Sequence, residues 1–155
     1  PNSATGRTAK MVGDGPSRDD LEALTREYAP ENVTFHGERP PDEIPSFLSE
    51  LDVYFQPSYR EGLCITVIEA MACGLPVVGS KAGGISESVV HGETGLLAPA
   101  NAIDKHCAHL RTLGEDDTLR RRYGRASREH VAENYSAEAL RDRFLDAVSM
   151  ASRKR

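Results

Sequence analysis

Short apolar runs alternate with segments of helical spacing over the first hundred residues. The apolar runs near residues 10–13, 32–36, 53–56, 77–80 and 96–98 predict strands, and glycine or proline follows each of them closely. Helices are predicted between them, over 17–28, 45–51, 65–72 and 85–90. Alternation of this kind is typical of a parallel sheet with helices on both faces. We therefore expect an α/β, Rossmann-like fold with one parallel sheet.

The pattern changes after Pro99. Residues 100–155 carry no strand signal, and their apolar residues recur at helical spacing, as in Leu140, Phe144 and Val148. Ser136 is placed to cap the last helix. At the first helix, Ser17 and Asp20 are spaced to form a capping box. We expect a helical C-terminal third whose last helix carries an apolar stripe that must be covered.

Size, charge and cysteines narrow the class of protein. A chain of 155 residues predicts one domain, here residues 9–155, preceded by a tag or divergent segment at residues 1–8. A net charge of -5 argues against nucleic-acid binding. Three cysteines without a C-x-x-C pair favour a reducing compartment, and no run approaches the length of a transmembrane segment. We expect a cytoplasmic protein; peripheral membrane contact through the basic C-terminus is the alternative.

Glu69 stands on a helix whose other residues are nearly all apolar, which predicts a carboxylate that loses hydration. A structural ion pair with an arginine, or the cap of a nearby loop, is the open alternative. Glu61 lies eight positions earlier, at the mouth of the loop after the third strand. In doubly wound sheets, ligands collect in such loops at the carboxyl ends of strands. The pair therefore predicts a ligand site.

The turn between these glutamates is suited to an anion. Gly62 lets the backbone approach a ligand closely, and the amides from Leu63 to Thr66 are unpaired donors at a helix N-terminus. Two carboxylates beside an anion-binding turn suit a ligand with both hydroxyls and phosphates, such as a nucleotide sugar.

Other candidates are interpreted as structural. The turn Gly13-Asp14-Gly15-Pro16 is a tight connection before a helix rather than a phosphate cradle. Gly83-Gly84 is expected to shape a loop facing the same cleft as Glu61. His91 is expected to be solvated in its turn, and no metal site is predicted.

The run PSYREGLCITVIEAMACGLPVVGSKAGGISESVVHGETGLLAP resembles the C-terminal domain of retaining, GT-B-fold glycosyltransferases of family 4. The signature of that family is two glutamates separated by seven residues, matched here by Glu61 and Glu69. The upstream runs MVGDGPSRDDLEAL and NVTFHGERPPDEIPSFLSELDVYFQPS also fit in order and spacing, so the resemblance covers about residues 9–150.

The resemblance implies a role for each residue of the site. Glu61 would contact the hydroxyls of the donor sugar, and Glu69 the ribose. Backbone amides would complete the site: those of Gly62 and Leu63 for the sugar, and those of Cys64 and Thr66 for the diphosphate. The base would lie against Gly37, Glu38 and Arg39. The resemblance implies no catalytic nucleophile, metal or cofactor; Cys64 would act through its backbone alone.

The function implied is the donor-binding half of a retaining glycosyltransferase that transfers a hexosyl group to an acceptor hydroxyl. Whole enzymes of the family also have an N-terminal acceptor domain, for which 155 residues leave no room. The chain alone is therefore expected to be inactive or weak, with that domain or a second copy of itself as partner. A non-catalytic nucleotide- or partner-binding domain and a GT-B sugar-nucleotide epimerase are the alternatives.

Overall fold

The computed structural model describes residues 6–152, which divide into two compact units at the boundary between Ile44 and Pro45. We call them the N-terminal unit and the C-terminal unit. The predicted segment at residues 1–8 lies mostly outside the described residues.

The N-terminal unit is a single β-α-β motif. Strands β1 (Ala9–Val12) and β2 (Val33–Gly37) pair in parallel, and helix α1 (Arg18–Tyr28) connects them. The predicted capping box at α1 is wrong: Ser17 precedes the helix with φ -92° and ψ 6°, and its side chain makes no capping hydrogen bond. A capping side chain needs an extended backbone to reach the free amides of the first turn.

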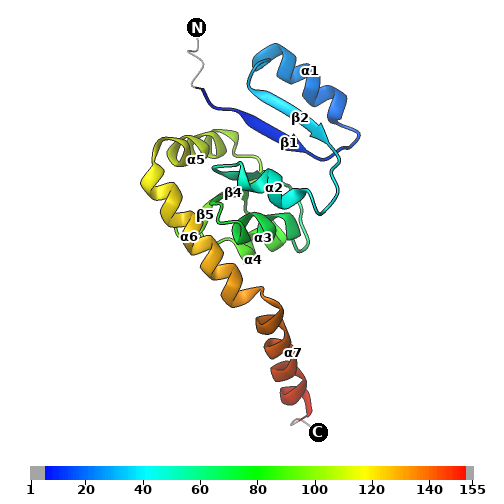
Figure 1. Cartoon of the computed structure of the whole chain (residues 1–155), viewed down its shortest axis with the longest axis vertical. Helices are drawn as coiled ribbons and strands as arrows, with labels where there is room; N and C mark the ends of the chain where they lie inside the picture. Colours follow the sequence, from blue (N-terminus) through cyan, green and yellow to red (C-terminus); the bar gives the residue numbers. More distant parts are fainter. Residues whose placement is uncertain (1–5, 153–155) are drawn as a thin grey trace. The chain divides into compact units, whose positions relative to one another are not determined.

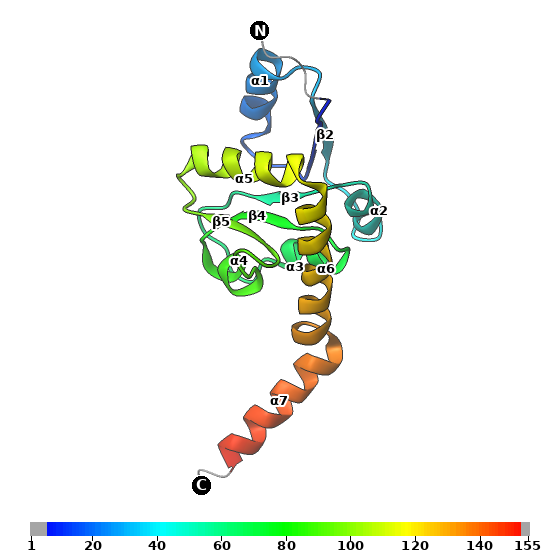
Figure 2. The ribbon, with the colours of Figure 1, turned by 90° about the vertical axis from the view of Figure 1, so that its left-hand side faces the viewer.

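The C-terminal unit, coloured from cyan to red in Figure 1, contains a three-stranded parallel sheet in the order β3-β4-β5 (Figure 2). Its elements are α2 (Ile44–Ser49), β3 (Tyr54–Gln56), α3 (Ile65–Ala72), β4 (Val77–Ser80), α4 (Gly83–Ser88), β5 (Gly95–Ala98), α5 (Ile103–Glu115), α6 (Asp117–Asn134) and α7 (Ala137–Ser152).

Helices cover both faces of this sheet, with α5 on one face and α3 and α4 on the other (Figure 2). The central strand β4 shows why the core has two parts, because successive side chains of a strand point to opposite faces. Val77 packs with Val67, Met71 and Ile85, whereas its neighbour Val78 belongs to a separate cluster with residues of α5 and α6. The core of the described chain therefore lies around β4.

The predicted fold class, α/β with parallel strands, helices on both faces and a helical C-terminal third, is confirmed. All five predicted strands occur within one or two residues of their expected ends. They form two sheets, however, where the sequence predicts one. Apolar periodicity fixes which segments become strands but not which strands pair, and only pairing decides the number of sheets.

The predicted loss of hydration at Glu69 is wrong, because helix α3 buries only one of its faces. Val67, Ala70 and Met71 are buried, whereas Ile65 and Glu69 are exposed. The cysteines at the two ends of α3 differ in the same way: Cys64 is buried and Cys73 is exposed. An apolar run shows that a helix has an apolar surface, not that this chain covers all of it.

The predicted cap of the last helix is confirmed, since the Ala139 amide donates to Ser136 Oγ at 3.2 Å. Helix α7 extends away from the sheet of the C-terminal unit (Figure 2). Its apolar stripe is exposed, with 50% of Leu140, 68% of Phe144 and 51% of Val148 accessible to solvent.

Candidate functional site

The loop that follows β3 holds Glu61 in a short hydrogen-bond network. Ser58 Oγ donates to Glu61 Oε1 at 2.7 Å, and Gln56 Nε2 reaches the same oxygen at 3.3 Å. Gln56 Nε2 also donates to Ser58 Oγ, and the Tyr54 hydroxyl donates to Gln56 Oε1. Tyr54 and Gln56 are two positions apart on β3, so they share a face of the sheet. The network fixes one carboxylate oxygen of Glu61.

Two glycines at the start of α4 pack directly against this loop. A Cβ atom on Gly83 would collide with the carbonyl oxygen of Glu61, and one on Gly84 with that of Gly62. The Gly84 amide donates to the Gly62 oxygen at 2.9 Å. Gly83 also has φ +40°, which side chains disfavour. The pair therefore packs against the loop beside Glu61, but it lies in the first turn of α4 rather than in a loop before that helix.

Some backbone amides at the start of α3 have a hydrogen-bond acceptor and others have none among the described residues. The Ile65 amide donates to the Leu63 oxygen at 3.0 Å, and the Val67 amide to the Cys64 oxygen at 3.1 Å. Four amides make no hydrogen bond to any described residue, and they are the ones for which the resemblance implies contacts with the sugar or the diphosphate. These are Gly62, Leu63, Cys64 and Thr66. Such donors at the start of a helix suit an anion.

Glu69 is exposed, and no ion pair to it occurs within residues 6–152. The alternative that it serves a structural salt bridge therefore has no support in the described part of the chain. Glu69 and Glu61 both act on the Tyr54 hydroxyl. Burial is the largest cause that raises the pKa of the Tyr54 phenol. A hydrogen bond with Thr66 lowers this pKa, and the negative charges of Cys64, Glu69 and Glu61 raise it further.

Tyr54 is the residue that sequence reasoning missed. It brings both glutamates into one electrostatic environment, and its neighbour Gln56 holds Glu61. The sequence did carry a signal for this residue, because Tyr54 and Gln56 share one face of the strand just before the acidic loop.

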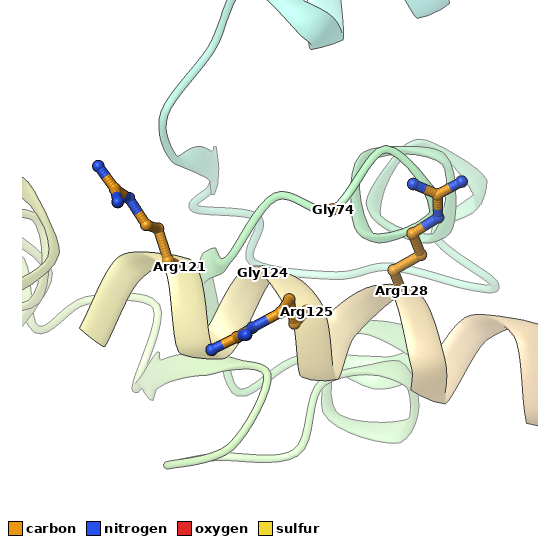
Figure 3. A pocket seen from close by; sticks show the side chains of 5 residues that line it. All are labelled: Gly74, Arg121, Gly124, Arg125 and Arg128. Carbon is orange, nitrogen blue, oxygen red and sulfur yellow. The ribbon is translucent and has the colours of Figure 1, made fainter. Parts of the chain in front are cut away.

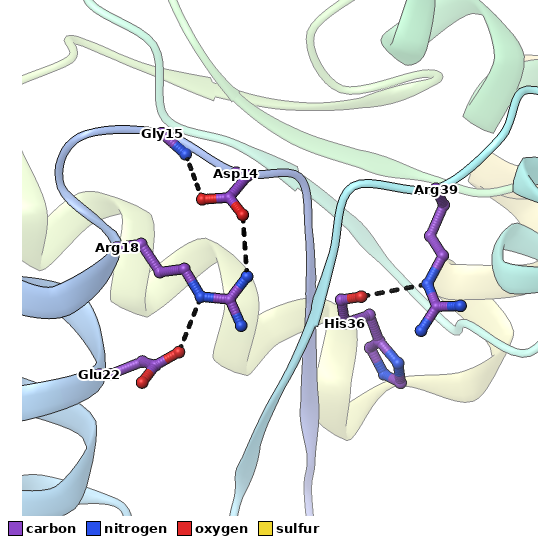
Figure 4. Close-up of polar contacts among 6 residues, drawn as sticks. All are labelled: Asp14, Gly15, Arg18, Glu22, His36 and Arg39. Carbon is purple, nitrogen blue, oxygen red and sulfur yellow. Dashed lines mark hydrogen bonds and ion pairs between the residues drawn. The ribbon is translucent and has the colours of Figure 1, made fainter.

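The residues assigned to the base lie in the N-terminal unit, after β2. Gly37 has φ +68°, and its carbonyl oxygen accepts the Gly13 amide at 2.8 Å. Arg39 Nε donates to the His36 oxygen at 3.1 Å (Figure 4). The Arg39 guanidinium also pairs with Glu43 at 3.6 Å. Glu38 is exposed. The structure thus orders this loop within its own unit, apart from the unit that carries the two glutamates.

The turn after β1 is also ordered by its own side chains. Asp14 accepts the Gly15 amide at 2.7 Å and pairs with Arg18 at 3.1 Å, while Arg18 Nε binds Glu22 at 2.8 Å (Figure 4). These contacts hold the turn together through side chains of the turn itself and of the start of α1, as expected of a structural connection.

His91 is exposed but not simply solvated, because its Nδ1 accepts the Leu97 amide at 2.9 Å. A tight turn brings the ring back onto the strand it leads into, which a sequence does not reveal. Within the described residues, no group of three potential ligands is arranged to hold a metal ion. None of the described helices is both long and apolar enough to cross a membrane.

The parallel α/β fold matches that of GT-B glycosyltransferases. The structure superposes on the Anabaena protein HepE in complex with UDP with a TM-score of 0.82 and 26% identity, covering 94% of this chain and 42% of that one. Sucrose-phosphate synthase from Thermosynechococcus elongatus gives a TM-score of 0.79 and 31% identity, covering 92% of this chain and 38% of that one.

The family model for glycosyl transferases group 1 matches residues 6–130, and the chain belongs to this family. The chain is 37% identical to the sulfoquinovosyl transferase SQD2 of Arabidopsis thaliana over 124 residues. That match covers 78% of this chain but 24% of the relative, so the chain spans about a quarter of the relative's length.

Proposed function

We propose that these residues form the donor-binding half of a retaining glycosyltransferase of family 4, which transfers a hexosyl group from a nucleotide-diphosphate sugar to an acceptor hydroxyl. One observation carries the proposal above all. A carboxylate held by two hydrogen bonds, that of Glu61, stands directly before a turn whose amides lack acceptors in the described chain.

Each group in that loop has a role in the proposal. The free oxygen of Glu61 accepts hydrogen bonds from hydroxyls of the donor sugar, and the amides of Gly62 and Leu63 contact the same sugar. The amides of Cys64 and Thr66 donate to the diphosphate, where the helix dipole also favours negative charge. Glu69, exposed and unpaired within the described residues, accepts hydrogen bonds from the ribose. Gly37, Glu38 and Arg39 are assigned to the base.

The chemistry proposed for the whole enzyme needs no protein nucleophile. The acceptor oxygen bonds to the anomeric carbon on the face from which the diphosphate departs, so the configuration is retained. The chain contributes by positioning the donor and by stabilising the negative charge that develops on the leaving diphosphate. Amides fixed in place before the reaction are effective here because they need not reorganise.

The relatives suggest which donors to test first. The Anabaena neighbour has been solved with UDP and with UDP-glucose. We propose a uridine nucleotide sugar as donor, and a panel of nucleotide sugars read by thermal unfolding tests it. A ligand that binds only the folded state raises the melting temperature with concentration. A panel in which no nucleotide sugar moves the melting temperature would contradict donor binding by this chain.

A non-catalytic nucleotide- or partner-binding domain is the second candidate, because every contact proposed for Glu61, Glu69 and the turn between them is one of donor binding. A sugar-transfer assay with and without an added acceptor-binding domain separates the two. Product formed only when the domain is added indicates half of an enzyme, whereas donor binding without product in both arms favours the binding domain.

A further inference from the structure

A hollow of about 540 Å³ lies where α6 meets the turn between α3 and β4, lined by three arginines and two glycines (Figure 3). The glycines form its floor. Gly74 has φ +81°, and a Cβ atom on Gly124 would collide with the Gly74 carbonyl oxygen. Because neither carries a side chain, α6 rests directly on the turn after α3, and the space above stays open.

The arginines are Arg121, Arg125 and Arg128, which recur at helical spacing and so share one side of α6. All three are exposed, and no carboxylate of the described residues pairs with any of them. Figure 3 shows Arg121 and Arg128 reaching to the side of α6 on which Gly74 lies, with Arg125 between them. Like charges at this spacing repel one another and destabilise a helix.

No ion pair within the described residues offsets that repulsion, although the chain has 24 acidic and 19 basic residues. The neighbouring Arg120, by contrast, pairs with Asp52 and Asp117. The same helix thus neutralises one arginine and leaves three others facing an open hollow. A bound anion would remove the repulsion.

The hollow is separate from the loop of Glu61. Strands β3 and β4 are parallel, and Glu61 follows the carboxyl end of β3. Gly74 precedes β4, at the amino end of the same sheet. The two features therefore lie at opposite ends of the strands of this sheet.

From this geometry we infer that the hollow is a second anion site, which binds phosphate groups of a ligand other than the sugar donor. Guanidinium groups bind phosphate through paired, charge-assisted hydrogen bonds. Arg121 and Arg128 are seven residues apart, about 10 Å along the helix axis, so the site suits a ligand with two or more phosphates. Such groups occur in soluble diphosphates and in phospholipid headgroups.

Site-resolved NMR of the 155-residue chain tests the inference with inorganic pyrophosphate as the probe. The amides of Gly74 and Gly124 should shift on titration, with a dissociation constant raised about tenfold or more in the triple variant R121Q/R125Q/R128Q. The control variant R26Q/R111Q/R141Q loses the same charge from exposed arginines elsewhere and should bind as the wild type does. Shifts confined to Gly62 and Leu63 would report the donor loop instead and would overturn this inference while leaving the proposed function standing.

A second arm identifies the source of the phosphate. Vesicles containing phosphatidylglycerol are sedimented with the wild type and with both variants. If the protein sediments with the vesicles only when the three arginines are present, the site binds lipid headgroups. If pyrophosphate shifts the amides but the protein does not sediment with the vesicles, the site binds a soluble ligand. If the triple variant matches the wild type in both arms while its melting temperature shows it folded, the inference is wrong. A single R125Q variant repeats the test should the triple variant unfold.

Discussion

Replacing Gly84 by alanine tests the packing that holds the proposed donor loop. A Cβ atom at position 84 would overlap the carbonyl oxygen of Gly62 and lie 2.9 Å from the Cα of Leu63. Both are backbone atoms, which cannot swing aside as the end of a side chain can. The hydrogen bond from the Gly84 amide to the Gly62 oxygen, 2.9 Å long, also lies in the path of the new methyl group. The segment from Glu61 to Leu63 must therefore move.

The loss of stability follows from the overpacked contact and the lost hydrogen bond. Overpacking a tight contact costs about 1–3 kcal/mol, and a lost internal hydrogen bond about 1 kcal/mol more. We expect the free energy of unfolding to fall by about 2–4 kcal/mol, which for a chain of this size lowers the melting temperature by about 4–16 °C. Because the displaced segment carries the proposed sugar contacts, donor affinity should fall at least about tenfold.

Thermal unfolding and calorimetric titration with the donor measure both effects, and two other glycines provide controls. Gly15 and Gly62 have open space where a Cβ atom would go, so alanine at either should leave the melting temperature unchanged or slightly raised. G62A should nevertheless weaken donor binding, because the ligand is proposed to approach that backbone closely. A G84A protein that melts and binds as the wild type does would refute the reasoning.

Three further predictions concern other parts of the chain. S58A removes the 2.7 Å hydrogen bond to Glu61. Calorimetry should show donor binding weakened about 2- to 10-fold, with little change in the melting temperature. Unchanged affinity would show that Gln56 alone holds the carboxylate. Burial, and then the positive charges of His91, His106 and Lys105, lower the pKa of His109. The stability linked to His109 is thus present above about pH 6.5 and lost as the pH falls, so the melting temperature should drop more steeply with acidification in the wild type than in H109Q. Equal slopes would contradict this assignment. The exposed stripe of α7 should cause self-association, so sedimentation at rising concentration should show larger species in the wild type than in the variant F144S; a wild type that stays monomeric throughout would refute it.

The sequence was informative wherever a local pattern determines the structure. The strands, the helix over Ile65–Ala72 and the cap at Ser136 follow from periodicity and side-chain chemistry within a few residues. The division into two sheets and the exposure of Glu69 depend on which distant segments meet, and the hydrogen bond to His91 depends on the shape of a turn. A pattern within one segment does not encode those contacts.

The candidate site shows the same division. Glu61, Glu69 and the turn between them were predicted from residue type and spacing. The role of Tyr54 and Gln56 in holding Glu61, and the collision that makes Gly83 and Gly84 necessary, require coordinates. The sequence gives no signal for the arginines around Gly124, because only the fold brings Gly74 next to them.

Calorimetric binding of UDP and UDP-glucose to the wild type, E61A and E69A tests the central claim most directly. The account predicts that E69A weakens both ligands by a similar factor of about 10 to 100, since both contain the ribose. It predicts that E61A weakens UDP-glucose by such a factor and leaves UDP nearly unchanged, because UDP lacks the sugar hydroxyls. If wild-type binding is measurable and both variants bind both ligands as the wild type does, the two glutamates do not hold the donor and the account is wrong.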